Sequence, residues 1–589
     1  MIISDKSATN SAAAITVNTG VIKEGKISGL AHFTEHMLFL GSKKYPKATE
    51  FVDFITQKNG IFNGYTDFDS TAFYFRIHPK HFPKGLDIFS RFFIDPLFDP
   101  KYVMKEINSV NSEFERNLQL DSKRREQVLR EISAKGSLFN KFSTGNHLSL
   151  KKYCEANNLN LREEVIKYYT THFRSDNMKL IVYGNQNINY YKKLVENSFI
   201  HMERNTSPYI WVNSSPMPFK LFGEGRLTLY KTLTSHQNFE IMILLPDIFA
   251  SLPHNIGLYF KVILNYRGKG SLRDVLIRNG LGSHFRATLR KTYDGWSIFK
   301  VGCFLTRKGI NQLSRVISVI FKYFQYLKSI SVDPKLYQFV KRYYDIRFLL
   351  LKRRERPFNF VRNMCLAFLK YPQRLLFTQH KILYMYNAKA IQDYGKYFVI
   401  NNSIIMLGDR QFKYKLVSNY KSFLTNFNPH SIFDKREPWY NVPYSTYRFT
   451  TAFMNQITYD NTHPEKLGFT KNFIFLKGYR LPKTVHLVRQ CPKSLIRECL
   501  LEYRKDNFDL TPVNLESNNM YSLSFKRDRS YLISKLNFFN KFIFPAAIIS
   551  PVNQALFKLF VVGFTHHFKN FFYSQSIKHN LIKVRMKAK

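Results

Sequence analysis

A weak internal repeat constrains the fold of this chain most, because self-similarity can define an architecture before any single motif does. Each copy reads as a helix that ends in Asn-Gly, then a strand, then a second helix. The segments of the first copy are FVDFITQKNG (51–60), TAFYFRI (71–77) and HFPKGLDIFSRFF (81–93). Those of the second copy are LRDVLIRNG (272–280), WSIFKVGCFLT (296–306) and INQLSRVISVIFKYFQYL (310–327). We therefore expect tandem homologous α+β domains.

Length and composition divide the chain into three regions. At 589 residues the chain is too long for a single hydrophobic core. The predicted domains are 1–205, 206–430 with the second copy, and 431–589, which begins with a proline-rich stretch. Within the first domain the patterns predict strands over 11–20 and 71–77, helices over Leu30–Leu40 and Phe82–Phe93, and one long charged helix over Asp99–Arg130.

The chain is strongly basic, with 89 Lys and Arg against 42 Asp and Glu and a formal charge of +47. Such a charge usually indicates nucleic acid or an anionic membrane as the partner. Here the basic residues are spread along the whole length, and no nucleic-acid-binding motif accompanies them. Because the chain is also rich in Phe and Tyr, AT-biased codon usage explains the charge better. We expect no specific nucleic-acid partner and no membrane partner.

The cysteines favour a reducing compartment, and the apolar segments predict neither a signal peptide nor a membrane span. The five cysteines are odd in number and form no CxxC pair, which argues against a disulfide framework and a cysteine metal site. The N-terminus lacks the basic start and long apolar run of a signal peptide. The apolar stretch at 542–564 is interrupted by Pro545, Pro551 and Lys558, so it is a poor membrane span. We expect a cytoplasmic protein.

The segment GLAHFTEHMLFLG (29–41) carries the strongest chemical signal. His32 and His36 are four residues apart, so on a helix both imidazoles project from one face and can bind one metal ion. Glu35 lies between them, where its carboxylate can reach a water on that ion without being a ligand. This is the order H-x-x-E-H of an inverzincin. The pattern is short, however, and histidines on a helix surface produce it by chance.

A later charged segment supplies the third protein ligand that a catalytic zinc ion usually has. In KEINSVNSEFERN (105–117), Glu106 and Glu113 are two helical turns apart and therefore share a face. Glu113 is the candidate third ligand, and Glu106 is a candidate supporting carboxylate that orients a ligand or tunes basicity. These stacked glutamates and the apolar residues around the HxxEH segment favour a single zinc ion over surface histidines.

At this point the chain resembles the insulinase (pitrilysin) family, and within it the insulin-degrading-enzyme and nardilysin branch. The resemblance rests on GLAHFTEHMLFLGSKKYP (29–46), SVNSEFERN (109–117), FNKFSTGN (139–146) and SDNMKLIVYG (175–184). It implies tandem domains like those of LuxS and the mitochondrial processing peptidase, each a mainly antiparallel sheet packed with helices. It further implies that 431–589 is a linker and an incomplete middle domain.

The resemblance also implies a function and a set of site residues. The implied function is that of a zinc endopeptidase acting on peptides or small proteins, with His32, His36 and Glu113 on zinc and with Glu35 and Glu106 as catalytic residues. It further implies that the strand near Phe62, Asn63, Gly64 and Thr66 pairs with the substrate backbone. From the residues alone, Asn63-Gly64 could equally be a plain turn.

Several departures from the family leave the substrate open. The family's second half, which supplies an arginine and a tyrosine that stabilise the oxyanion, matches no part of this chain. The opening residues MIISD match the middle of the family's first hairpin, so we expect an upstream strand and any targeting segment to be missing. Arg267 stands in a loop where the family has a glutamate for the substrate N-terminus, and Lys123 replaces an aromatic residue.

Two functions remain in competition. The first is an active zinc metalloendopeptidase, because the ligand and base set is complete. The second is a truncated, catalytically weak peptide-binding half-molecule that needs a C-terminal half or self-association. A nucleic-acid-binding function would rest on charge alone.

Overall fold

A computed structural model describes the chain as two compact units. The larger unit comprises Met1–Tyr266, Gly270–Lys341 and Lys352–Thr470, and the smaller one comprises Arg267–Lys269, Arg342–Leu351 and Lys471–Lys589. The structure describes residues 1–203, 209, 216–223, 225–246, 255–293, 296–349, 356–378, 381–459, 464–469, 513–517, 522–525, 550–553, 555–557 and 559–564.

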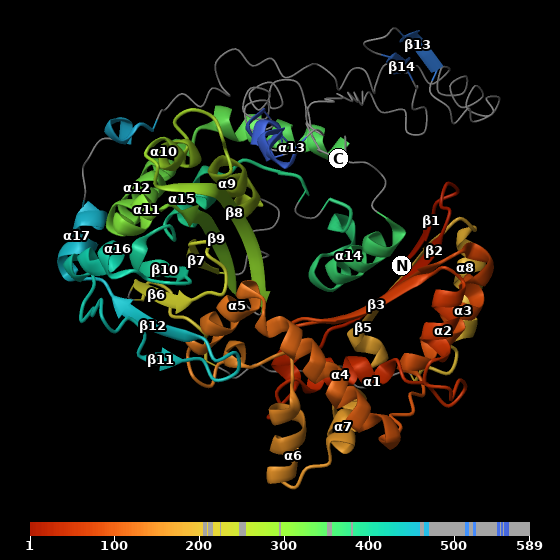
Figure 1. The fold of residues 1–589 in the computed structure, drawn as a ribbon. Helices are drawn as coiled ribbons and strands as arrows, with labels where there is room; N and C mark the ends of the chain where they lie inside the picture. The colour runs from red at the N-terminus through yellow and green to blue at the C-terminus, as the bar shows by residue number, and fades with distance from the viewer. Residues whose placement is uncertain are drawn as a thin grey trace. The chain divides into compact units, whose positions relative to one another are not determined.

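The first sheet of the larger unit has five strands in the order β1-β5-β2-β4-β3 (Figure 1). Their bounds are β1 Ile2–Ser4, β2 Ser11–Val17, β3 Ile61–Thr66, β4 Thr71–Ile77 and β5 Met178–Gly184. Strands β1 and β5 are parallel, and the other neighbours are antiparallel. Among the strands that the structure describes, β3 is therefore an edge strand and pairs with β4 alone.

The second sheet has seven strands in the order β11-β12-β6-β10-β7-β9-β8. Their bounds are β6 Arg226–Lys231, β7 Asn238–Pro246, β8 Gly282–Tyr293, β9 Trp296–Leu305, β10 Ser403–Asp409, β11 Lys435–Arg436 and β12 Pro443–Arg448. The run β6-β10-β7-β9-β8 repeats the connectivity of the first sheet, including one parallel pair, β6 with β10. This confirms the predicted tandem α+β domains.

The Asn-Gly breaks of the repeat end equivalent helices in the two domains. Asn59 has φ 54° after α2, and Gly280 has φ +67° after α10, so each break contains one residue in the left-handed region. The helices of the first domain are α1 Leu30–Leu38, α2 Glu50–Gln57, α3 Phe82–Ser90, α4 Pro100–Leu118, α5 Asp121–Glu131, α6 Tyr153–Ala156, α7 Leu161–His172 and α8 Ile188–Phe199. Those that follow are α9 Ile256–Leu264, α10 Leu272–Arg278, α11 Arg307–Asn311, α12 Leu313–Ile330, α13 Pro334–Leu349, α14 Pro357–Lys370, α15 Ala388–Gly395, α16 Tyr414–Val417 and α17 Thr451–Tyr459.

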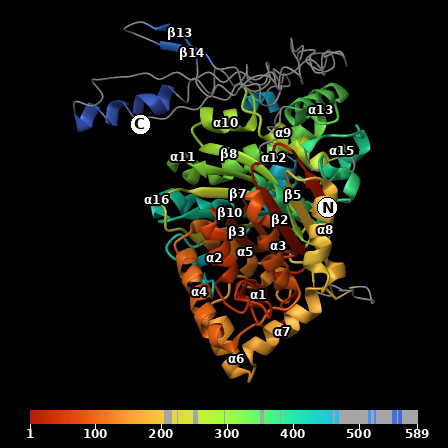
Figure 2. The same ribbon diagram turned by 90° about the vertical axis from the view of Figure 1, so that its right-hand side faces the viewer.

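The two faces of the first sheet are covered by helices from different parts of the chain. Alternate residues of β2 point to opposite faces: Ala13, Ile15 and Val17 belong to a core cluster with residues of α1, α3 and α4, whereas Ala12 and Ala14 pack against α14. Figure 2 shows α1, α4 and α7 together on the first of these faces, and Figure 1 shows α14 on the other. The small alanine side chains let α14 approach the sheet closely.

The predicted long helix over Asp99–Arg130 is wrong in one respect, because the structure divides it into α4 and α5. Leu120 between them is extended, with φ −108° and ψ 108°. The Asp121 carboxylate accepts hydrogen bonds from the backbone amides of Leu233 and Thr234 at 2.8 and 3.0 Å. A tertiary contact with the second domain therefore redirects a segment whose local pattern favours continuous helix.

An apolar cluster joins the two domains of the larger unit. It includes Phe114 of α4, Val128 of α5 and Met242 of β7, with Phe142 stacked on Trp439 at a centroid distance of 4.2 Å. Since each fully buried apolar side chain contributes about 1.5–3 kcal/mol, this cluster holds α5 against the second sheet.

The smaller unit has one described hairpin, β13 Val513–Ser517 and β14 Ser522–Phe525, which are antiparallel. Most of the region predicted to be the third domain lies outside the described residues, and the domain boundaries stay predictions. Strands β11 and β12 of the second sheet follow residue 430. No helix within the described ranges is both long and apolar enough to cross a membrane.

Candidate metal centre

Helix α1 presents both motif histidines on its less buried side. Its apolar residues, among them Leu30 and Met37, are buried in the core of the first domain, whereas His32 and His36 are half-buried. The helix begins after Gly29, whose φ of 89° and close approach to Gly145 exclude a side chain, because a Cβ atom would lie 2.3 Å from the Gly145 Cα. The two imidazole rings are perpendicular, with centroids 4.8 Å apart.

Helix α4 brings Glu113 to the same place. Its Oε2 lies 3.6 Å from Nε2 of His32, and one ligand atom from each of His32, His36 and Glu113 lies within 4.8 Å of the others. Across the described ranges these three form the one group of His, Cys, Asp or Glu side chains gathered in this way. Two imidazoles and one carboxylate are a ligand set that suits zinc and leaves a fourth position open.

Each histidine is oriented through its other ring nitrogen. Nδ1 of His32 lies 2.7 Å from the carbonyl oxygen of Thr144, and Nδ1 of His36 lies 3.2 Å from Oε2 of Glu106. If these nitrogens donate, both Nε2 atoms carry lone pairs and are available to a metal ion. The Glu106 carboxylate is buried and lies where it can orient the His36 ring, and its supporting role stays a prediction.

Thr144 is a site residue that sequence reasoning missed. It contributes only its backbone carbonyl, so its side-chain type gives no chemical signal. The segment FNKFSTGN that contains it was part of the family resemblance, but without an assigned role.

Glu35 is buried beside the histidines and fixed by β3. The Thr66 hydroxyl donates to Oε2 of Glu35 at 2.6 Å. Burial raises the pKa of Glu35, while the neighbouring His32 and the Thr66 hydrogen bond oppose that rise. Gly64 makes room for the carboxylate, because a Cβ atom there would lie 2.1 Å from Oε1 of Glu35.

The four predicted substrate-binding residues all lie in β3, so Asn63-Gly64 is part of a strand and not a turn. Phe62 packs against Phe39 and Phe51, with ring centroids 5.5 and 5.4 Å apart. The Asn63 amide donates to the Tyr74 hydroxyl at 3.2 Å. Gly64 and Thr66 contact Glu35, so the four residues all have neighbours within the domain. What β3 can offer a substrate is therefore mainly the backbone along the edge that faces away from β4.

Comparison with known proteins places this architecture in one family. Domain profiles described as "Insulinase (Peptidase family M16)", "Peptidase M16 inactive domain" and "Middle or third domain of peptidase_M16" match residues 1–158, 160–344 and 351–577. The chain belongs to the insulinase family, peptidase family M16.

Several similar proteins are named as insulin-degrading enzymes. Insulin-degrading enzyme-like 2 of Arabidopsis thaliana is 27% identical over 566 residues, which are 95% of this chain and 54% of the relative. Insulin-degrading enzyme of Drosophila melanogaster is 29% identical over 363 residues, 61% of this chain and 36% of the relative. The chain thus spans about half the length of the first relative.

The fold is also that of pitrilysin. Its crystal structure superposes with a TM-score of 0.73 at 19% identity, covering 98% of this chain and 57% of pitrilysin. At this identity the likeness supports the fold alone.

Proposed function

We propose that the chain is a zinc metalloendopeptidase that hydrolyses peptides or small proteins. The single observation that carries this proposal is the convergence of His32, His36 and Glu113 beside the buried carboxylate of Glu35. Helices α1 and α4 hold these groups from two different parts of the chain. Membership of a peptidase family supports the same conclusion.

One zinc ion would bind to the Nε2 atoms of His32 and His36 and to the Glu113 carboxylate. When bound, zinc supplies Lewis acidity and lowers the pKa of a coordinated water to about 7. Glu35 takes a proton from the attacking water and later gives it to the leaving amine. Thr66 holds one oxygen of Glu35, so the carboxylate keeps one orientation during both transfers.

The free edge of β3 would bind the substrate backbone. An extended peptide can add to an exposed sheet edge through main-chain hydrogen bonds. Because Gly64 and Thr66 also contact Glu35, a peptide on this edge passes next to the proposed general base.

The test is the substitution Glu35→Gln. It should abolish peptide cleavage and keep zinc, because the amide cannot accept the proton and Glu35 is not a ligand. Glu50→Gln, at the half-buried first residue of α2 in the same domain, is the matched control and should cleave like the wild type. Unchanged cleavage by the Glu35→Gln protein would refute the assignment.

A second candidate function is that of a peptide-binding half-molecule. It is favoured by one fact, namely that the Arabidopsis relative has about twice the matched length. If the purified chain binds zinc and peptides but cleaves only after the second half of a relative is added, this candidate is correct. The cytoplasmic location stays a prediction that fractionation of cells can test.

A further inference from the structure

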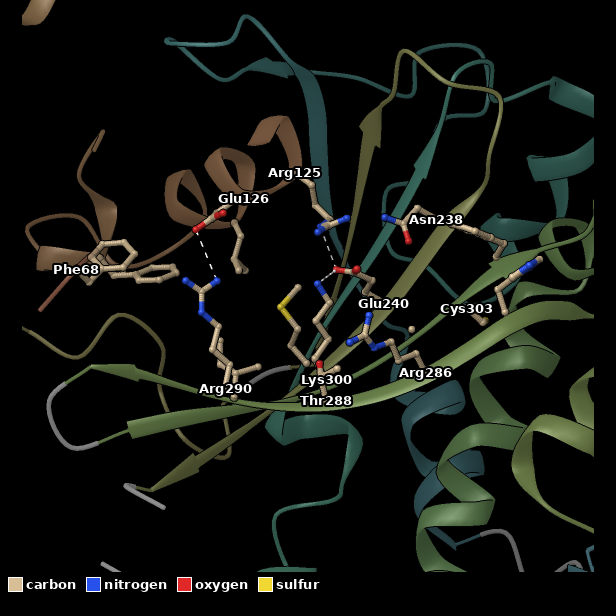
Figure 3. Close-up of a pocket in the computed structure, with 17 residues that line it drawn as sticks. Phe68, Arg125, Glu126, Asn238, Glu240, Arg286, Thr288, Arg290, Lys300 and Cys303 are labelled. Carbon is tan, nitrogen blue, oxygen red and sulfur yellow. Dashed lines mark ion pairs between the residues drawn. The ribbon is translucent and has the colours of Figure 1, made fainter. Parts of the chain in front are cut away.

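A cavity of about 450 Å³ lies between the second sheet and helix α5 (Figure 3). Its floor is one face of three neighbouring strands, since side chains two apart on a strand share a face. The pairing places Gly302 of β9 opposite both Arg286 of β8 and Glu240 of β7. Gly302 has no side chain, and the Glu240 side chain lies beside it, 3.4 Å from where a Cβ atom would stand.

Basic side chains dominate the lining of this cavity. They are Arg286 and Arg290 of β8, Lys300 of β9 and Arg125 of α5, against the acids Glu126 and Glu240. Figure 3 shows these groups converging from the sheet and from the helix. The lining therefore carries more positive than negative charge.

The two acids are already bound to part of this basic set. The Glu240 carboxylate lies 3.1 Å from Arg125 and 2.6 Å from Lys300. The Glu126 carboxylate lies 3.8 Å from Arg290. Burial alone would raise the pKa of Glu126, but the charges of Arg130 and Arg290 lower this pKa to about 2. Glu126 is therefore ionised at neutral pH.

Arg286 is the exception. Within the part of the chain that the structure describes, no acidic side chain forms an ion pair with Arg286. Arg286 is also exposed to solvent. An arginine guanidinium is a planar donor that matches a carboxylate with two parallel hydrogen bonds. Arg286 is thus a cation at the floor of a concave site, available to an anion.

One residue of the cavity lining closely follows the proposed substrate strand in the chain. Phe68, which lines it, follows Thr66 at the end of β3 by two residues. Asp67 between them lies 3.8 Å from Arg290. At about 3.3 Å per residue, an extended peptide that leaves β3 in this direction reaches the Arg290 end of the cavity within roughly two to four residues. Arg286 lies four residues further along β8, so the peptide reaches it within roughly six to eight residues.

We propose that this cavity binds acidic side chains of the peptide substrate, so that the chain selects peptides with Asp or Glu roughly six to eight residues from the cleaved bond. The inference rests on the proposed peptidase function. A peptide side chain fits better than nucleic acid, because the site is a small hollow at the end of a strand edge and not an open groove along which a phosphate backbone could run.

The test compares two fluorescent peptides that differ only by Glu or Gln at these positions. Binding is measured by anisotropy in the full chain with zinc, in a Glu35→Gln background that prevents cleavage. The acidic peptide should bind more tightly, and Arg286→Gln should weaken its binding roughly tenfold while leaving the Gln peptide unchanged. Arg307→Gln, an exposed arginine of α11 outside the cavity, is the control with the same charge change.

Thr288→Glu provides an independent variant, since Thr288 lies between Arg286 and Arg290 on the same face and an acid there should repel the acidic peptide. Equal affinities for the two peptides in the wild-type cavity, or equal effects of Arg286→Gln and Arg307→Gln, would overturn the proposal. Zinc content is measured in the wild-type chain and in every variant. A wild-type chain that binds no zinc would contradict the proposed function and not the cavity proposal. Thermal unfolding confirms that each variant is folded.

Discussion

Replacing Glu106 should weaken zinc binding although Glu106 is not a proposed ligand. Its carboxylate lies 3.2 Å from Nδ1 of His36 and is buried, so it orients the ring. Glu106→Gln keeps a hydrogen-bond acceptor but removes the charge, and Glu106→Ala removes the contact altogether.

The expected sizes follow from this geometry. A charge-assisted hydrogen bond contributes about 1 kcal/mol more than a neutral one, so Glu106→Gln should raise the Kd for zinc about fivefold. Loss of such an outer contact typically costs about 10- to 100-fold in metal affinity, which is the range expected for Glu106→Ala.

The assay is competition with a chromophoric chelator, which requires no peptidase activity. Glu115→Gln is the matched control, because Glu115 lies on the same helix and is exposed, bonding Asn111 at 2.8 Å. If Glu106→Ala binds zinc as tightly as Glu115→Gln, His36 is not oriented by Glu106 and the reasoning is wrong.

Three further predictions concern packing and charge. Gly64→Ala should lower kcat/KM about 100-fold with zinc retained, because its Cβ would lie 2.1 Å from Glu35; Gly395→Ala, where the nearest atom is 3.4 Å away, should have no effect in the same peptide assay. Burial raises the pKa of Glu24 from 4.5 to about 8, so the folded state binds more protons than the unfolded chain in this interval. The free energy of unfolding should therefore fall as pH rises from about 4.5 to about 8, and Glu24→Gln should flatten that part of a denaturant series. Phe142→Ala, at a buried side chain, should cost about 3–5 kcal/mol in the same denaturation measurement.

Much of the site could be predicted because its residues carry local signals. The four-residue spacing of His32 and His36 and the seven-residue spacing of Glu106 and Glu113 are properties of single helices. The structure brings the two helices together as expected. The repeated sheet connectivity likewise follows from patterns within each copy.

Other features depend on contacts between distant segments and gave no local signal. The break at Leu120 is stabilised by Asp121 binding backbone amides of the second domain. Thr144 acts through its carbonyl alone. Gly64 is predicted to bind substrate, and the sequence gives no sign that its lack of a side chain also makes room for Glu35.

The basic cavity likewise depends on contacts between segments that are far apart in the sequence. Arg125 belongs to α5, Arg286 to β8 and Lys300 to β9. In the sequence they are dispersed among many other basic residues, and codon usage alone accounts for the overall charge. Only the pairing of β8 with β9 and the packing of α5 show that some of these charges converge.

Zinc stoichiometry in the full chain tests the central claim most directly. After metal removal and dialysis against limiting zinc, elemental analysis of the wild-type chain should find one zinc ion per chain. His36→Ala and Glu113→Gln should each lose tight binding, while Glu115→Gln should keep it. A wild-type chain that binds no zinc, or a His36→Ala chain that binds it as tightly as the wild type, would contradict the assignment of this centre.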